Sequence, residues 1–270
     1  MPWLLSANLS MLFTHLPMLE RVRAAGQAGF DGVEIQFPYA VPPQALRAAL
    51  DDARMPLALC NVPAGDLLEG GAGLAGVPGR EAHFDRALRD ALAYARIARP
   101  QRVNVLPGRL LKGTPHEAAL DTLADNLAVA ASAFAELGVA VVCEAINRID
   151  MPGFLLATAT ELSAMLERVD HPNLSAQLDF YHMQQMGEPL PGAIAHLGER
   201  IGHVQFADSP GRGAPGTGSI DFAAAFAALE ASNYRGWIGA EYRQPEGADD
   251  LLWLDRWRGA GYVRRLARNG

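Results

Sequence analysis

Eight short apolar runs, rich in β-branched residues, recur along the chain. Each has the length and composition of a buried strand, and helical periodicity fills the gaps, as with Phe84, Leu88 and Leu92 on one face. Strands that alternate with helices are typical of parallel sheets joined by right-handed crossovers. Eight such units in 270 residues predict the α/β class and a single closed (β/α)8 TIM barrel. The predicted strands are 3–8, 32–37, 57–61, 102–106, 139–144, 174–179, 201–206 and 237–242.

An open, doubly wound sheet is the alternative fold for the same alternation. The first predicted strand is not followed by a glycine-rich phosphate turn, and no stretch is left over to form a second, substrate-holding domain. We therefore expect residues 1–270 to form one barrel domain.

Three connections are long or rich in glycine and proline, and each follows a predicted strand: 63–79, 148–154 and 208–218. The carboxyl ends of barrel strands open at the catalytic face, so all three should lie there. Residues 63–79 are too long for a routine turn, and we interpret them as a lid or rim loop.

Helix boundaries are also legible. Thr114 stands three residues before Glu117, and Thr158 stands three residues before Glu161, which predicts a capping box at each helix start. Gly138 is expected to end the helix that precedes the fifth strand.

Composition excludes several function classes. The chain has 30 Asp+Glu against 23 Lys+Arg, a net charge of −7 and no basic run, so we expect no nucleic-acid partner. A small anionic substrate would need a local positive group. The first residues carry no charged segment or small-residue cleavage site, and no stretch of about 18 apolar residues occurs. We therefore expect a cytoplasmic protein with no membrane partner.

Two residue types are scarce. Cys60 and Cys143 lack CxxC spacing, which excludes a cysteine zinc cluster and argues against a disulfide framework. Schiff-base chemistry would rest on one lysine, Lys112, in a predicted loop. The aromatic tail with Trp253 and Trp257 is either a last helix packed in the core or a subunit contact, and a homo-oligomer is left open.

Oxygen-bearing side chains end the last four predicted strands. They are Glu144, Asp179, Gln205 and Glu241. Carboxylates gathered in one cavity would repel each other, whereas a divalent cation neutralises them and accepts carboxylate and amide oxygens together. Because neither cysteine nor histidine is among the four, the set favours Mg²⁺ or Mn²⁺ over zinc.

Strand parity places Gln177 and His203 two residues before the ends of their strands, in the next layer of the barrel. One interpretation is that they orient Asp179 and Gln205 from behind. The other is that His203 is a hydrogen-bonded core histidine unrelated to a metal.

These strand ends lie within longer motifs that follow one another in a set order. Through them the chain resembles the hydroxypyruvate isomerase family of the xylose isomerase-like barrels. The motifs are ANLSMLF (7–13), AGFDGVEIQFPY (28–39), NVPAGD (61–66), PGRE (78–81), EAINRIDMPGF (144–154), LDFYHMQ (178–184), GHVQFADSPGRGAPGTGSI (202–220) and GWIGAEY (236–242).

The resemblance implies an isomerase that interconverts hydroxypyruvate and tartronate semialdehyde. It implies that Glu144 and Glu241 are the proton donor and acceptor, and that Glu144, Asp179, Gln205 and Glu241 hold the divalent ion. Moving hydrogen between adjacent carbons through an enediolate needs one base and one acid, and a metal that stabilises the charge. No nicotinamide is required, and the dinucleotide fingerprint is missing.

Five further residues are candidates for substrate contacts. His182, three residues after Asp179, either reaches a substrate oxygen or is a surface histidine. Arg212 either holds a substrate carboxylate by a two-pronged hydrogen bond or is a solvated loop arginine. Asp150 either binds a hydroxyl or caps a turn. Asn8 and Glu34 point inward by strand parity, where they complete the pocket floor or satisfy polar groups of the barrel.

Three departures from the family pattern lie near the expected substrate: Ala145, His15 and Gly211. Because of these departures, the identity of the substrate is not fixed by the resemblance. A longer keto acid of the 2-oxo-tetronate type and a keto sugar that is epimerised are alternatives to hydroxypyruvate. A metal-dependent dehydratase would use the same carboxylates but expel water. An endonuclease acting at DNA lesions would need histidine metal ligands and a basic surface, and the sequence predicts neither. A sugar-acid binding module would bind its ligand without exchanging hydrogen between ligand and solvent.

Overall fold

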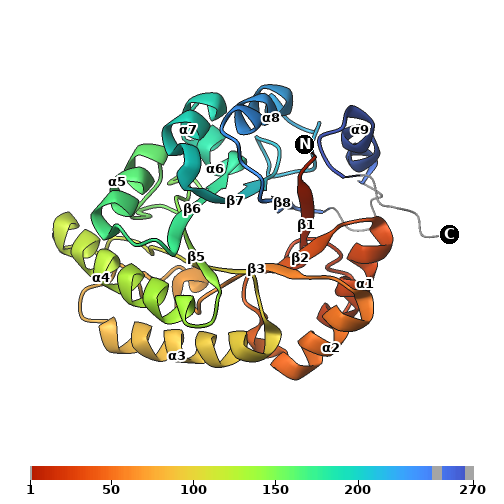
Figure 1. Ribbon diagram of the computed structural model, residues 1–270. Coiled ribbons are helices and arrows are strands. Elements are labelled where there is room, and N and C mark those ends of the chain that lie inside the picture. The colour runs from red at the N-terminus through yellow and green to blue at the C-terminus, as the bar shows by residue number, and fades with distance from the viewer. Residues whose placement is uncertain (1, 245–250, 265–270) are drawn as a thin grey trace.

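The strands of the molecule close into a barrel, and helices surround it (Figure 1). A computed structural model describes residues 2–244 and 251–264. All strand pairs are parallel, in the order in which they occur along the chain, and the first strand closes the barrel against the last. The strands are β1 (Leu4–Asn8), β2 (Gly32–Ile35), β3 (Leu57–Asn61), β4 (Arg102–Val105), β5 (Ala140–Glu144), β6 (Leu174–Asp179), β7 (Ile201–Phe206) and β8 (Trp237–Ala240). The predicted (β/α)8 TIM barrel is confirmed.

The helices follow the strands as expected, with additional short turns in the connections. The α-helices are α1 (Met18–Ala28), α2 (Pro43–Ala53), α3 (Glu81–Ala98), α4 (His116–Ala135), α5 (Ala159–Val169), α6 (Phe180–Gln185), α7 (Leu190–Leu197), α8 (Phe222–Ala231) and α9 (Leu252–Ala260). The 3-10 turns are η1 (Pro38–Ala40), η2 (Leu67–Glu69) and η3 (Gly198–Arg200). Among the described helices, none has both the length and the apolar character that a membrane crossing requires.

Three strands end sooner than their apolar runs suggested, and β4 does so by one residue, at Val105. β2 ends at Ile35 and β8 at Ala240, so Gln36 and Glu241 begin loops instead of ending strands. Glu241 is still held in register, because its N–H donates to the carbonyl of Phe206 at 3.0 Å. Both side chains reach the catalytic face from the first position beyond the sheet.

The barrel interior near this face holds buried polar side chains, and one of them has room only because a glycine lies opposite it. Glu34 of β2 is fully buried, and a Cβ on Gly239 of β8 would overlap its carboxylate. The side chains between sheet and helices are apolar, and Cys143 lies among them in the hydrophobic core, out of phase with Glu144 as strand parity predicts.

The aromatic tail packs in the core. Trp257 of α9 lies 4.7 Å from Phe206 and 4.8 Å from Phe226 between ring centroids, and Trp253 is 1% exposed. α9 therefore closes the ring of helices between α8 and α1 (Figure 1). This confirms the core-packing interpretation of the tail and leaves the oligomeric state a separate question.

The capping predictions have a mixed outcome. Thr158 Oγ1 accepts from the N–H of Glu161 at 3.1 Å, as predicted, although the Glu161 carboxylate returns its bond to Ala157 rather than to Thr158. The cap at Thr114 is wrong: Pro115 takes the N-cap position without a side-chain bond, so the Thr114 hydroxyl stands one residue outside the first turn.

The end of α4 agrees with the prediction. The helix stops at Ala135, and Gly138, with φ at 67°, lies just beyond its end. The N–H of Val139 donates to the carbonyl of Phe134 at 3.1 Å and that of Gly138 to the carbonyl of Ala135 at 2.9 Å, which are the paired bonds of a Schellman motif with glycine at its left-handed position. The left-handed backbone at this glycine serves the turn into β5, where an L side chain would be strained.

The three long connections follow β3, β5 and β7, as expected. In 63–79, Arg80 pairs with Asp66 at 2.9 Å, and Arg109 donates to the carbonyls of Leu67 and Gly71. Leu68 lines the central cavity, so the segment forms part of its rim. These contacts favour the rim interpretation over a free lid.

Candidate active site

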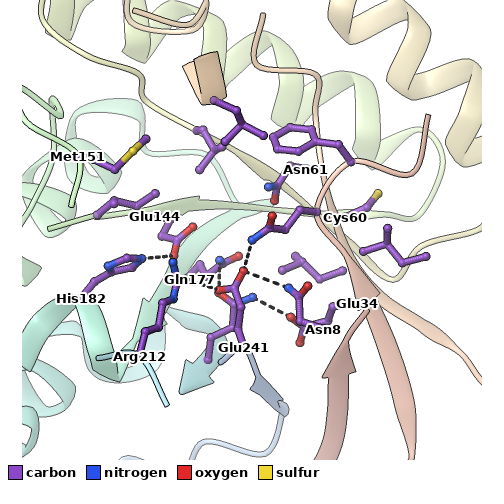
Figure 2. Close-up of a pocket in the computed structure, with 18 of the residues that line it drawn as sticks. Asn8, Glu34, Cys60, Asn61, Glu144, Met151, Gln177, His182, Arg212 and Glu241 are labelled. Carbon is purple, nitrogen blue, oxygen red and sulfur yellow. Dashed lines mark hydrogen bonds and ion pairs between the residues drawn. The ribbon is translucent and has the colours of Figure 1, made fainter. Parts of the chain in front are cut away.

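One cavity of about 250 Å³ opens at the carboxyl ends of the strands. Glu144, Gln205 and Glu241 line it, together with His182 and Arg212 (Figure 2). The side toward β2, β3 and the loop after β5 is more apolar, with contributions from Phe37, Leu68, Leu106, Ile146 and Met151. The cavity is therefore charged on one side and apolar on the other.

The structure brings the four predicted strand-end residues together, and all are buried. Glu144 Oε2 accepts from Asn104 at 2.9 Å. Asp179 Oδ1 accepts from the N–H of Tyr181 at 2.8 Å, while its Oδ2 has no hydrogen-bond partner among the described residues. An unpartnered, buried carboxylate oxygen at the centre of the site is a free position for a ligand or an ion.

The Glu241 carboxylate is held from several sides. Glu241 Oε1 accepts from Asn8 at 3.1 Å and from Gln36, and its Oε2 accepts from Arg212 at 3.1 Å. These bonds are drawn in Figure 2. Asn8 and Gln36 therefore fix the direction of the Glu241 carboxylate.

Gln205 sits on a network at the cavity floor. Its Oε1 accepts from Gln177 at 2.6 Å, and its Nε2 donates to Glu34 Oε2 at 2.7 Å. Gln177 thus contacts a predicted ligand directly. His203 instead donates to Glu34 at 2.8 Å, and Glu34 in turn contacts Gln205. His203 is therefore a hydrogen-bonded core histidine that supports Gln205 through Glu34, so both interpretations offered for it apply.

The Glu34 carboxylate stays ionised in this network. Burial alone would raise its pKa, but the charge and hydrogen bond of His203, with further bonds from Ser6 and Gln205, place the pKa below its ordinary value. Both carboxylate oxygens are taken up by protein donors. The geometry therefore favours satisfaction of barrel polar groups over a substrate contact for Glu34.

Three carboxyl groups resist ionisation together: Glu144 and Glu241, which line the cavity, and Asp179, which is buried next to them without lining it. Burial raises the pKa of Asp179 to about 7, and burial with the charges of Glu241 and Asp179 raises the pKa of Glu144 well above its ordinary value. Burial also raises the pKa of Glu241, although Arg212 opposes this shift. Like charges in a buried space are stable only if protons or a cation neutralise them.

Arg212 supplies part of that positive charge. Its Nη2 lies 3.1 Å from Glu241 Oε2 and 3.6 Å from Asp179 Oδ2, and its guanidinium stands 5.3 Å from the centre of the Tyr181 ring. The backbone at Arg212 is left-handed, with φ at 55°, which aims the side chain from the loop after β7 into the cavity. Arg212 is thus inside the cavity and not a solvated loop arginine.

His182 of α6 is also buried at the centre. Its Nε2 lies 3.6 Å from Asp179 Oδ2 and 3.9 Å from Glu144 Oε1. Burial and the nearby Arg212 lower the pKa of the imidazole well below its ordinary value, so it is neutral. Glu144, Asp179 and His182 have ligand atoms within 4.8 Å of one another, the spacing of a metal site.

Asp150 lines the cavity, but its side chain is hydrogen bonded to protein groups around the loop after β5. Its Oδ2 accepts from Tyr181 at 2.7 Å and from Asn147 at 3.1 Å. The supporting amides Asn104, Gln36 and Asn147 were not singled out from the sequence. Parity along the predicted second and fourth strands would have pointed Gln36 and Asn104 inward, whereas Asn147 lies in a loop that no periodicity describes.

The donor set fits a hard divalent cation. Oxygen ligands at the strand ends, an unpartnered Asp179 Oδ2 and neighbouring carboxyl groups with raised pKa values are what such an ion would satisfy.

Fold and site together define the class: the chain belongs to the xylose isomerase-like TIM barrel family, whose sequence profile matches residues 22–257. Within it, the chain is 39% identical to the hydroxypyruvate isomerase of Escherichia coli K12 over 254 residues, covering 94% of this chain and 98% of that protein. It is 37% identical to the 2-oxo-tetronate isomerase of Pectobacterium atrosepticum, covering 93% of this chain and 97% of that protein.

A solved structure is also similar over nearly the whole chain. It is described as an AP endonuclease, family 2, from Brucella melitensis. The two chains share 35% sequence identity with a TM-score of 0.89, over 95% of this chain and 99% of the other.

Proposed function

We propose that the protein is an isomerase that interconverts hydroxypyruvate and tartronate semialdehyde. The observation that carries the proposal is the pair Glu144 and Glu241, two buried carboxyl groups that enter one cavity from the end of β5 and from the first position after β8, with Arg212 between them (Figure 2). The 39% identity to an enzyme named hydroxypyruvate isomerase supports the substrate.

The reaction moves hydrogen between C3 and C2 of the keto acid. One glutamate removes a carbon-bound proton to give an enediolate, and the other delivers a proton to the neighbouring carbon. Glu144 and Glu241 take these two roles, which exchange when the reaction runs backwards. Asn104 and the pair Asn8 and Gln36 hold the two carboxylates in place by hydrogen bonds.

Arg212 and His182 bind the substrate in this account. The Arg212 guanidinium offers a planar fork to the substrate carboxylate, and Tyr181 supports it from its ring face. His182 Nε2 lies between Asp179 and Glu144, within reach of a substrate oxygen. Asp150, hydrogen bonded to Tyr181, borders the same cavity and can accept from a substrate hydroxyl.

Mg²⁺ or Mn²⁺ is the cofactor that we propose, held by Glu144, Asp179, Gln205 and Glu241. When bound, the ion supplies positive charge that stabilises the enediolate oxygens. The raised pKa values of Glu144, Asp179 and Glu241 mean that a positive charge among them would stabilise their ionised forms. Gln205 offers its Oε1, whose other contact is the amide of Gln177.

A longer keto acid is the second candidate. It is supported by the 37% identity to an enzyme named 2-oxo-tetronate isomerase and by the apolar side of the cavity, which extends beyond the carboxylate cluster. Cleavage of DNA is disfavoured, because the chain carries a net charge of −7 and His182 is the one histidine that lines the cavity among the described residues.

The test is to incubate the protein with hydroxypyruvate and Mg²⁺ and follow the mixture by proton NMR and mass spectrometry. We expect an aldehyde hydrate of a product with the same mass as the substrate. A product lighter by one water would indicate a dehydratase, and binding without conversion would indicate a binding module. Conversion of a 2-oxo-tetronate with none of hydroxypyruvate would replace the three-carbon substrate by the four-carbon one.

A further inference from the structure

A buried amide meets the imidazole of His182. Asn147 is 0% exposed and follows β5 three residues after Glu144, and its Nδ2 lies 2.7 Å from His182 Nδ1. His182 is 2% exposed, so neither side chain has water as an alternative partner. The direction of this one hydrogen bond decides which ring nitrogen carries the proton.

The orientation of the Asn147 amide follows from its other contacts. Its Oδ1 accepts from the backbone N–H of Ile149 at 3.1 Å and of Asp150 at 2.7 Å, and its Nδ2 donates to Asp150 Oδ2 at 3.1 Å. If the amide were reversed, its oxygen would face the Asp150 carboxylate and its NH2 group would face two N–H donors. The NH2 group therefore points to His182.

Asp150 is itself fixed as an acceptor. The Tyr181 hydroxyl donates to Asp150 Oδ2 at 2.7 Å, and the same hydroxyl accepts from Gln185 Nε2 at 3.2 Å. Donors therefore run in one direction, from Gln185 through Tyr181 to Asp150. This leaves Asn147 no role at Asp150 other than that of a donor.

Since Asn147 donates to Nδ1, that nitrogen carries a lone pair and the proton of His182 is on Nε2. The Nε2–H group points toward the two carboxylates, 3.6 Å from Asp179 Oδ2 and 3.9 Å from Glu144 Oε1. A protonated ring nitrogen has no lone pair for a metal. The cluster of Glu144, Asp179 and His182 therefore resembles a three-ligand site in spacing but not in chemistry.

We infer that Asn147 is a positioning residue that keeps the proton of His182 on Nε2, which makes His182 a hydrogen-bond donor to a substrate oxygen and excludes it from the ligand set of the metal. The role toward substrate rests on the isomerase function proposed above. The tautomer itself does not, because it is set by contacts within the protein.

The test reads the tautomer by ¹⁵N–¹H correlation spectra of protein labelled at histidine, without substrate. The His182 signals are assigned from their loss in His182→Gln. In the wild-type protein we expect Nε2 protonated and Nδ1 unprotonated, both before and after saturation with Mg²⁺. A proton on Nδ1 in the wild type, or loss of the Nε2 proton when Mg²⁺ is added, would overturn the inference.

A charge-conserving swap provides the matched variant. Asn147→Asp combined with Asp150→Asn keeps the acceptor for the two N–H groups and the bond between the two positions, but it presents an acceptor to His182. We expect Nδ1 to become protonated and kcat to fall about 100-fold, as for a lost or misdirected proton donor. In the control Asp150→Asn, which retains the Asn147 donor, Nδ1 should stay unprotonated. An unprotonated Nδ1 in the swap would contradict the inference.

The two proposals fail separately. If the tautomer is as inferred but no keto acid is isomerised, the proposed function falls and the Asn147 role in the protein stands. If hydroxypyruvate is isomerised but His182 carries its proton on Nδ1, the function stands and the Asn147 inference falls. Should the swap not fold, the wild-type spectra still decide the tautomer.

Discussion

At the scale of single residues, Asp179 links the site to stability. Its pKa rises from 3.8 to about 7 in the folded protein, so the folded state holds this proton more tightly than the unfolded chain does. The stabilising contribution is therefore complete below about pH 4 and is lost as the pH rises toward 7. At neutral pH, the ionised group is a cost that a divalent cation would offset.

We expect the free energy of unfolding of the wild type, measured with urea and a chelator, to fall relative to Asp179→Asn between pH 4 and pH 7. Mg²⁺ added at neutral pH should restore stability in the wild type and have little effect in the variant. Parallel pH curves for the two proteins would contradict the raised pKa.

Arg212 gives the second prediction at this scale. Arg212→Lys keeps the positive charge among Glu241 and Asp179 but loses the planar fork and its stacking on Tyr181. We expect kcat/KM for hydroxypyruvate to fall by about 10- to 100-fold, the value of a charge-assisted hydrogen bond, mainly through KM. A change below about threefold would show that charge alone suffices.

Site residues were predictable where strand parity applies. Glu144 and Asp179 are the last residues of β5 and β6, and Gln205 is the last but one of β7. The first residue past β8, Glu241, keeps the strand's register through its bond to Phe206. The role of Asn147 was not predictable, because its contact with His182 joins two segments far apart in the chain, whereas its local bonds to Ile149 and Asp150 are those of an ordinary turn. His182 was placed correctly, but its tautomer depends on that same buried amide.

At the scale of elements, the contact between β2 and β8 depends on one glycine. Gly239→Ala would drive a methyl group into the buried Glu34 carboxylate and disturb its bonds to His203 and Gln205. We expect a loss of about 1–3 kcal/mol in unfolding free energy, as for an overpacked core.

The control for this change is Gly192→Ala in α7, where an added Cβ would have no neighbour within 4 Å. Alanine has the higher helix propensity, so this variant should be unchanged or stabilised by up to about 1 kcal/mol. Equal unfolding midpoints for the two variants would argue against close packing around Glu34.

Helix boundaries were predictable where the residue at the boundary makes hydrogen bonds only to its neighbours in the chain. Thr158 caps α5 because its hydroxyl stands directly over the first turn. The same pattern at Thr114 failed, since Pro115 occupies the N-cap and shifts the helix start by one residue. Gly138 ends α4, because its left-handed backbone lets the last carbonyls of the helix accept from the N–H groups of Gly138 and Val139.

At the scale of the whole molecule, α9 completes the ring of helices around the barrel, between α8 and α1 (Figure 1). Trp257→Ala would leave a cavity between Phe206 of β7 and Phe226 of α8. We expect a loss of about 3–5 kcal/mol in unfolding free energy. Leu252→Ala in the same helix, at a side chain 65% exposed, should change it by less than about 0.5 kcal/mol. A similar small effect for both would mean that α9 is peripheral to the barrel.

The barrel as a whole was predictable because alternation of strands and helices over the full length admits few closed solutions. The substrate is harder to infer from sequence, since the apolar side of the cavity is built by loops after several strands. Those loops differ in length and are held by contacts such as Arg80 with Asp66, which no local pattern encodes.

The most direct test of the two-carboxylate account is deuterium incorporation into hydroxypyruvate in D2O with Mg²⁺, measured for the wild type, Glu144→Gln and Glu241→Gln. The account predicts deuterium at carbon and an aldehyde product with the wild type, and product formation reduced by at least about 100-fold in each variant whose circular dichroism is unchanged. Product formation at the wild-type rate in either variant, or product from the wild type without solvent deuterium, would contradict it.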